Sequence, residues 1–495
     1  MAIFAANSPD NGVLNLDWQG VRQGDPLSPA LFILAEEYLL RGLQHLHNQH
    51  PEIAYHSGCS VKVPALGFAD DVLIFTSGSK SALSKVIGFL EHYQLISGQV
   101  INREKSYWVI SSKASPTRCS IVQKATEKIR WKLQSWGSNF LSFGGRITLL
   151  QSVLTTLPIY FLQVMPMPAA VYNKIETIFN KFLWDGLGWC KWSKVCAPYA
   201  EGGLNMRSLS DIHQAFMQKS WMRMREGNCL WSKFMLSKYC KTHHPRLAPV
   251  HTSHSRVWKN LHKVRDEAES KLHWQLGQGL CDFWVDSWLE IGPLSLTNVI
   301  SRDHLDMVRE TYVDIGSPDK VIWKSSADGQ YKFKSAYEEV RQQRQESALF
   351  SVIWHQNIPK KMSFLAWRLL NGWLPVDEMM TKKGISLASK CACCAQEETI
   401  KHVFFTNPIA QQLWSHFARL LSKRSNNIHS IHQVLRSWSL SVSVAGHIKQ
   451  VTPIVILWAL WEARNKAKHM AIPYSFARIR GRIMTLLVMN SKLQN

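Results

Sequence analysis

The chain is long, rich in apolar residues and strongly basic. Its 495 residues are 46% hydrophobic and carry a formal net charge of +22, with a pI of about 9.6. A chain of this size and composition can build several packed cores, which argues against disorder. The most apolar segment, residues 149–165, is interrupted by Pro158 and two glutamines. That interruption argues against a membrane span, and the charge favours a polyanionic partner.

The basic charge is concentrated after residue 100. Residues 1–100 hold five Lys or Arg against nine Asp or Glu, a balance of −4, so the remainder carries +26. An acidic site beside a phosphate-binding surface would have this distribution. General association with RNA or chromatin would also account for the basic part.

The first predicted element is a helix that follows residues 20–28. Ser28 is expected to cap it, because Pro29 suits the first helical turn and a serine hydroxyl accepts from free amide groups there. Its expected buried stripe is Leu31, Phe32, Ala35, Tyr38 and Leu39. Gly24, just before the helix, lets the backbone approach another group closely.

A β-hairpin is predicted next, over residues 66–75, with Asp70 and Asp71 at its tip. Apolar strand-forming residues flank this pair on both sides. Two adjacent carboxylates repel each other unless cations lie between them, and paired divalent ions are what phosphoryl transfer uses. The alternative is an ordinary polar turn.

A helix with a basic side is predicted around residues 122–136. Its apolar positions recur at three- and four-residue steps: Val122, Ala125, Ile129, Leu133 and Trp136. Lys124, Lys128 and Lys132 form a stripe on an adjoining face. Such a stripe suits either a phosphate backbone or simple solvation.

Three candidate zinc ligands occur near the C-terminal end. Cys391 and Cys394 form a C-x2-C pair and His402 follows eight residues later. A tetrahedral site needs a fourth ligand that this spacing does not supply, so the predicted site is incomplete and binds Zn²⁺ weakly, unless Cys393 or His416 substitutes. The other cysteines are scattered, and without a secretory signal we expect an intracellular protein, nuclear or cytoplasmic, with no disulfides.

Three segments in this order resemble the reverse transcriptases of plant LINE-type (non-LTR) retrotransposons. They are RQGDPLSP at residues 22–29, FADD at 68–71 and SGQVINREKS at 97–106. The resemblance implies that Asp70 and Asp71 hold Mg²⁺ or Mn²⁺. It also implies a template and nucleotide pocket made by these residues: Arg22, Gln23, Gly24, Phe68 and Lys105.

Further segments extend the resemblance to most of the chain. They include LSFGGR at 141–146, EGGL at 201–204 and a zinc-binding module over about 353–414. In that module the family pattern implies a fourth ligand, a cysteine, where this chain has Asn407. A further matching segment, GLCDFWVDSW at 279–288, has no chemistry attached to it. The implied fold is α+β, with an antiparallel palm sheet, a helical thumb and a small helical zinc module. The expected domains are 1–110 partial palm, 111–225 thumb and connection, 226–345 connecting region, 346–425 zinc-binding domain and 426–495 helical tail.

The resemblance also predicts which part of the active site is incomplete. A polymerase of this type needs a further aspartate from a palm strand that lies before RQGDPLSP in the family, so we expect a truncated protein whose hairpin has an unpaired or poorly covered edge. The leading hypothesis is a reverse-transcriptase-derived protein, inactive as this chain, that binds RNA and DNA with little sequence preference. A non-catalytic nucleic-acid-binding remnant and an unrelated zinc adaptor for protein partners are the alternatives, and the oligomeric state stays open.

Overall fold

The computed structural model is mainly helical with two small antiparallel sheets, so the fold is mixed α+β. It describes residues 2–6, 26–56, 58–68, 71–102, 104–108, 127, 129–133, 141–164, 167–279, 281–296, 302–423, 428–439 and 446–492. None of the described helices is long and apolar enough to cross a membrane.

The chain forms two compact units, each built from two separate segments. Unit 1 comprises residues 1–121 and 217–332, and unit 2 comprises residues 122–216 and 333–495. Each of the five domains predicted from the sequence is one continuous segment, unlike these units, and that division stays a prediction.

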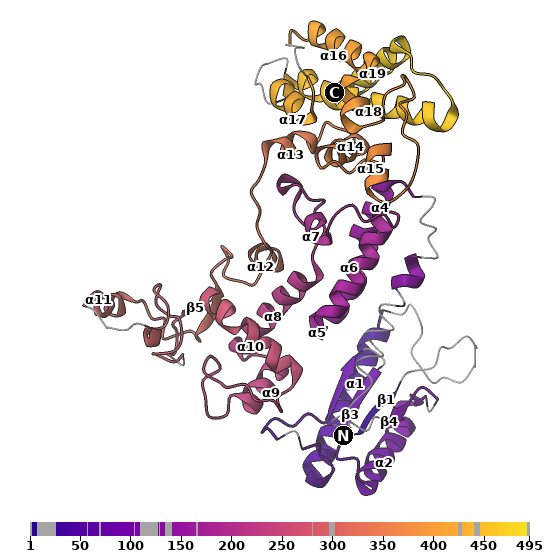
Figure 1. Cartoon of the computed structure of the whole chain (residues 1–495). Helices are drawn as coiled ribbons and strands as arrows, with labels where there is room; N and C mark the ends of the chain where they lie inside the picture. The colour runs from indigo at the N-terminus through magenta and orange to yellow at the C-terminus, as the bar shows by residue number, and fades with distance from the viewer. Residues whose placement is uncertain are drawn as a thin grey trace. The chain divides into compact units, whose positions relative to one another are not determined.

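The first segment of unit 1 contains a four-stranded sheet and two long helices (Figure 1). Its elements are β1 (Ala2–Ala6), α1 (Ser28–Gln49), η1 (Pro51–Ile53), β2 (Ala65–Phe68), β3 (Asp71–Thr76), α2 (Lys80–Ser97) and β4 (Tyr107–Trp108). The strand order is β2-β3-β1-β4, and the pairs are antiparallel.

One face of this sheet is covered by α1 and α2. Leu43 of α1, Ile74 of β3 and Val86 of α2 belong to the same buried apolar cluster. His47 of α1 also reaches β3, with Nε2 3.0 Å from the carbonyl oxygen of Phe75. Because strand side chains alternate, the opposite face of β3 stays open and presents the exposed residues Asp71 and Leu73.

The structure bears out one local expectation for this region and contradicts another. Strand β1 pairs along β3 from Ala2 opposite Thr76 to Ala6 opposite Val72, but β2 is the edge strand of the sheet, so the hairpin keeps an edge that no described strand pairs. The helix begins at Ser28, with Leu27 before it in helical conformation, so Ser28 lies in the first turn and not at the cap. The observed start of a helix commonly differs by one or two residues from the expected one, because the residue before the first turn, here Leu27, can also adopt helical angles.

The expected apolar stripes are only partly buried. In α1, Leu39 is buried while Leu31 and Tyr38 are exposed. In the short helical stretch at 129–133, Ile129 and Leu133 are buried as predicted. Val122, Ala125 and Trp136 lie outside the described residues, as do Lys124 and Lys128.

The second segment of unit 1 is a small helical region with a two-stranded sheet. After α8 (Leu209–Glu226), which spans the boundary between the units, it contains α9 (Leu230–Tyr239), α10 (Arg256–Lys271), β5 (Leu272–Gln275), η5 (Leu294–Leu296), α11 (Arg302–Glu310) and β6 (Lys320–Trp323). Strands β5 and β6 pair antiparallel.

Unit 2 is helical. Its first segment contains α4 (Phe143–Leu149), the π-helix η3 (Leu150–Leu154), α5 (Thr156–Val164), α6 (Ala169–Leu183), α7 (Trp192–Val195) and η4 (Tyr199–Glu201). Its second contains α12 (Phe333–Val340), α13 (Ala348–Ile353), α14 (Lys360–Leu370), α15 (Asp377–Lys382), the π-helix η6 (His402–Thr406), α16 (Pro408–Leu420), α17 (Ile431–Val434), the π-helix η7 (Leu435–Ser439), α18 (Gly446–Met470) and α19 (Phe476–Lys492).

The EGGL segment joins the two parts of unit 2. Glu201 is nearly buried and its carboxylate pairs with Arg341, 2.7 Å away. Gly202 has a φ of +84°, and its carbonyl accepts from the indole N–H of Trp367 at 2.8 Å. A side chain at Gly203 would collide with the backbone carbonyl of Ala197. This segment therefore needs glycine at both positions to form its turn.

Candidate functional site

The predicted hairpin is present and carries a carboxylate on the open face of the sheet. Strands β2 and β3 pair antiparallel, with Phe68 opposite Asp71, so two residues connect them. Asp71 is exposed at the first position of β3, and Phe68 is 81% exposed at the last position of β2. Asp71 can therefore reach a ligand that lies on the open face.

Close packing against α1 supports the same hairpin. Gly67 lies so near the helix that a Cβ there would be 2.0 Å from a carboxylate oxygen of Glu36. Lys105 is exposed two residues before β4, and its backbone N–H donates to the side-chain oxygen of Asn102 at 3.1 Å. The predicted site residues Arg22, Gln23, Gly24 and Asp70 lie outside the described residues.

A second candidate site is a cluster of three cysteines and one histidine in unit 2. The ligand atoms of Cys391, Cys393, Cys394 and His402 all lie within 4.8 Å of one another. The sulfurs of Cys391 and Cys393 are 3.3 Å apart, and the Cys394 sulfur is 3.1 Å from His402 Nε2. The edges of a tetrahedral zinc site are about 3.5–3.8 Å, so these four groups fit Zn²⁺.

The surroundings of His402 suit a candidate metal ligand. Its Nδ1 lies 3.3 Å from the Thr406 hydroxyl, which leaves Nε2 toward the cysteines. Burial lowers the pKa of His402 and so favours the neutral imidazole, the form that binds metals. A hydrogen bond at the other ring nitrogen is typical of ligating histidines.

Asn407 and His416 have other roles. The Asn407 side chain is completely buried and caps α16, accepting from the Ala410 N–H at 2.8 Å. It also donates to the carbonyl oxygens of His402 and Val403. His416 packs edge-on against Phe417 and Phe476. Of the two substitutes considered from the sequence, Cys393 lies with the other candidate ligands.

A buried ion network holds the loop that carries the cysteines, and nothing in the sequence pattern indicated it. Glu398 is 1% exposed and lies between Cys394 and His402 in the chain. Arg464 of α18 donates to Glu398, with Nε 3.2 Å from the carboxylate. The Glu398 carboxylate in turn accepts from the Asp377 backbone N–H, also at 3.2 Å. The loop is thereby fixed to α15 and α18.

The GLCDFWVDSW segment supplies a structural ion cluster in unit 1. Asp286 is buried and pairs with Arg225 and with His244, whose Nε2 is 3.2 Å away. Arg225 also pairs with Glu269 at 3.0 Å, and Glu269 accepts from the Trp221 indole N–H. Burial would raise the pKa of Asp286, but the hydrogen bond from His244 and the charge of Arg225 outweigh it and hold the pKa below its usual range.

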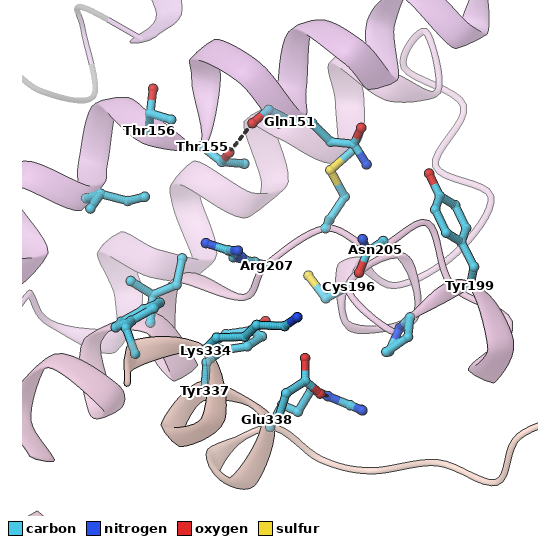
Figure 2. Close-up of a pocket in the computed structure, with 16 residues that line it drawn as sticks. Gln151, Thr155, Thr156, Cys196, Tyr199, Asn205, Arg207, Lys334, Tyr337 and Glu338 are labelled. Carbon is cyan, nitrogen blue, oxygen red and sulfur yellow. Dashed lines mark hydrogen bonds and ion pairs between the residues drawn. The ribbon is translucent and has the colours of Figure 1, made fainter. Parts of the chain in front are cut away.

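Unit 2 also contains a polar pocket of about 470 Å³ (Figure 2). Lys334, Tyr337 and Glu338 of α12 lie on one side of it, and Gln151 and Thr155 lie on the other. The Cys196 thiol lines this pocket, but burial raises its pKa well above the usual value. The thiol is therefore protonated and a poor nucleophile.

Two family models match the chain, and their positions agree with these sites. Residues 10–143 match the model described as reverse transcriptase (RNA-dependent DNA polymerase). Residues 331–414 match the model described as zinc-binding in reverse transcriptase. The chain thus carries a reverse transcriptase region followed by the zinc-binding region of such proteins.

Curated relatives point the same way. A protein of Arabidopsis thaliana, provisionally described as a ribonuclease H protein, is 26% identical over 338 residues, which are 58% of this chain and 54% of that protein. The retrovirus-related Pol polyprotein of the type-2 retrotransposable element R2DM of Drosophila melanogaster is 33% identical over 108 residues, 21% of this chain and 9% of that protein.

The family models and relatives together identify a reverse transcriptase sequence of the plant non-LTR retrotransposon type. The chain matches about half the length of the first relative and a small part of the second.

Proposed function

We propose that this protein is a reverse-transcriptase-derived nucleic-acid-binding protein whose β2–β3 hairpin forms part of a metal-dependent nucleotidyl transfer site. The main observation that supports this proposal is that Asp71 is exposed at the start of β3, on the sheet face that α1 and α2 do not cover. An open sheet face beside a hairpin carboxylate leaves room for a primer–template and for divalent ions.

The residues that would hold Mg²⁺ or Mn²⁺ are Asp70 and Asp71. Bound ions would activate the primer hydroxyl and neutralise charge on the phosphates. Arg22, Gln23, Gly24 and Phe68 would contact the template and nucleotide, and Lys105 the phosphates. These roles follow from the matching motifs.

Catalysis requires more oxygen ligands than this hairpin offers. Among the described strands of the sheet, Asp71 is the only carboxylate, since the β1 strand beside it reads AIFAA. Two divalent ions need several carboxylate oxygens. Binding needs only the excess of Lys and Arg, so we expect this chain to bind RNA and DNA without extending a primer. The second candidate function, a non-catalytic nucleic-acid-binding remnant, rests on the same observation.

Primer extension by the 495-residue chain tests this proposal. The wild-type chain, the D70A/D71A variant and a D303A/D306A control from exposed positions of α11 would be given a labelled DNA primer on an RNA template with Mg²⁺ or Mn²⁺. We expect all three to bind, with affinity that falls steeply as salt rises, and to extend equally slowly.

Two results would change the assignment. Extension by the wild type and by D303A/D306A that disappears in D70A/D71A would show a complete site and an active reverse transcriptase. Absence of binding to any RNA or DNA at low salt would refute nucleic-acid binding itself.

For the metal centre, we propose that Cys391, Cys393, Cys394 and His402 bind one structural Zn²⁺. The support is the convergence of all four ligand atoms, together with the commitment of Asn407 to the helix cap. A set of three thiolates and one imidazole leaves no open position, which is typical of structural zinc.

A further inference from the structure

Two pockets of unit 2 adjoin each other. The pocket of Figure 2 and a second one of about 570 Å³ are both lined by Gln151 and Tyr199. The second pocket lies among α4, α14 and α18. Each is large enough for one nucleotide, and because they share two lining residues they are here called the joined pockets.

The joined pockets are lined by cations with little opposing charge. Arg207 and Lys334 line the first pocket, and Lys360, Lys361 and Arg368 line the second. The first pocket has one lining carboxylate, Glu338, which pairs with Arg341, and the second has none. Within the described part of the chain, none of the five cations forms an ion pair. The surface is thus suited to several phosphate groups.

Arg368 is the most informative of these cations. Its Nε donates to the Trp373 carbonyl oxygen at 2.9 Å, and its guanidinium lies 5.3 Å from the ring centre of Phe143 and 5.7 Å from that of Trp184. Burial lowers its pKa to about 10, so it stays charged at neutral pH. Aromatic faces hold this cation in place, but no carboxylate neutralises it.

Aromatic rings alternate with the cations. Lys360 Nζ is 5.7 Å from the ring centre of Tyr199, and Lys361 Nζ is 5.3 Å from that of Trp458. Both rings line the second pocket. Proteins that bind single-stranded nucleic acids combine a positively charged groove with rings on which bases stack.

The junction of the two pockets is held by an irregular helix. Gln151 lies in the π-helix η3, and its Nε2 donates to the Leu204 carbonyl oxygen at 3.0 Å. Single π-helical turns inside α-helices are frequent at functional sites. This bond fixes the wall that both pockets share.

We propose that the joined pockets bind a single-stranded segment of nucleic acid. Lys360, Lys361 and Arg368 bind its phosphates, and Tyr199 and Trp458 contact its bases. Two adjoining pockets with five cations suit consecutive nucleotides better than one free phosphate. The inference rests on the proposed function and names the surface that performs the binding.

The test compares two double substitutions that remove the same charge. K360Q/K361Q changes exposed lysines of the joined pockets, and K174Q/K181Q changes exposed lysines of α6 outside them. Fluorescence anisotropy would follow binding of labelled 12-nucleotide U and dT strands and of a 12-base-pair duplex, from 50 to 300 mM salt. Circular dichroism would check that each variant is folded.

We expect K360Q/K361Q to weaken single-strand binding about tenfold and to reduce the slope of log affinity against log salt by about 1.4, the value for two lost phosphate contacts. K174Q/K181Q should change affinity by about twofold or less. If K360Q/K361Q weakens binding of the U and dT strands equally, the pockets recognise the phosphate backbone and the faces of the bases. A larger effect on U would add recognition of the ribose hydroxyl.

A photocrosslink gives an independent measurement on the unmodified chain. A strand containing 5-iodouracil should crosslink to peptides that contain Tyr199 or Trp458. Equal losses in both double variants, or crosslinks found only elsewhere, would overturn the inference while leaving nucleic-acid binding intact. Failure of the wild type to bind any strand would refute the proposed function instead.

Discussion

Cys393 was not among the three ligands expected from spacing, yet its sulfur lies with theirs. The C-x2-C spacing predicts that Cys391 and Cys394 face the same point, but it gives no direction for the cysteine between them. In the structure, the turn brings the Cys391 and Cys393 sulfurs within 3.3 Å. A cysteine adjacent to a ligand is therefore a candidate ligand whenever the loop turns this tightly.

Replacing Cys393 with serine should weaken zinc binding by tenfold or more. A neutral hydroxyl is a much poorer zinc ligand than a thiolate, so the fourth position would pass to water. Competition with a chromophoric chelator measures the affinity, and C59S in unit 1 serves as the matched control. Equal zinc affinity in C393S and the wild type would show that Cys393 is not a ligand.

Asp286 should make unit 1 sensitive to acid. The pKa of this carboxyl is lowered in the folded state, whereas an unfolded Asp has a pKa of about 3.9. Its stabilising contribution is therefore complete above about pH 4 and is lost as the pH falls through the lower folded value. We expect D286N to cost about 3 kcal/mol at pH 7, because Arg225 loses a buried partner.

The measurement is urea unfolding at pH 5 and pH 3, followed by tryptophan fluorescence. The wild type should lose more stability between these values than D286N does. The same loss in both proteins would mean that Asp286 does not carry the acid sensitivity.

At the scale of elements, the EGGL turn depends on the absence of a side chain at Gly203. A Cβ there would lie 1.9 Å from the carbonyl oxygen of Ala197, which also accepts from the Asn205 N–H. We expect G203A to destabilise unit 2 by roughly 3 kcal/mol, since backbone atoms must move. G481A is the control, because a Cβ in that part of α19 meets nothing within 4 Å and alanine favours helix.

Chemical denaturation of both variants measures the effect. G481A should be neutral or stabilising by up to about 1 kcal/mol. Similar stability of G203A and the wild type would show that the turn can open without cost.

Local patterns predicted the elements better than they predicted contacts. The hairpin β2–β3 is confirmed, because apolar strand-forming residues on both sides of two acids are a signal within one short segment. Asp286 was recognised only as part of a motif, since its partners Arg225 and His244 lie far away in the sequence. The pairing of β1 with β3 was likewise missed, because no local pattern specifies which distant strand fills an edge.

At the scale of the whole molecule, two compact units should unfold separately. Unit 2 contains the cysteine and histidine cluster, and unit 1 contains the Asp286 ion cluster. We expect calorimetry to show two transitions. A strong chelator should lower only one of them, because zinc stabilises only the unit that binds it.

Lowering the pH should lower the midpoint temperature of the other transition, and the D286N variant should show a smaller decrease. A single transition that responds to both the chelator and the pH would show that the units unfold together.

Each unit is made of two segments that are separated in the sequence, so the ribosome completes one unit only after part of the other has been synthesised. Residues 1–121 complete unit 1 only with residues 217–332, so residues 122–216 must be translated between them. At roughly 5–20 residues per second the sheet and its helices wait about 5–20 seconds or more for their remaining partners. During that time the nascent chain lacks the contacts that the later segment supplies, among them the hydrogen bond that Lys241 donates to the Gly58 carbonyl oxygen. A ribosome-bound chaperone that protects the first segment during this interval should therefore raise the yield of folded protein.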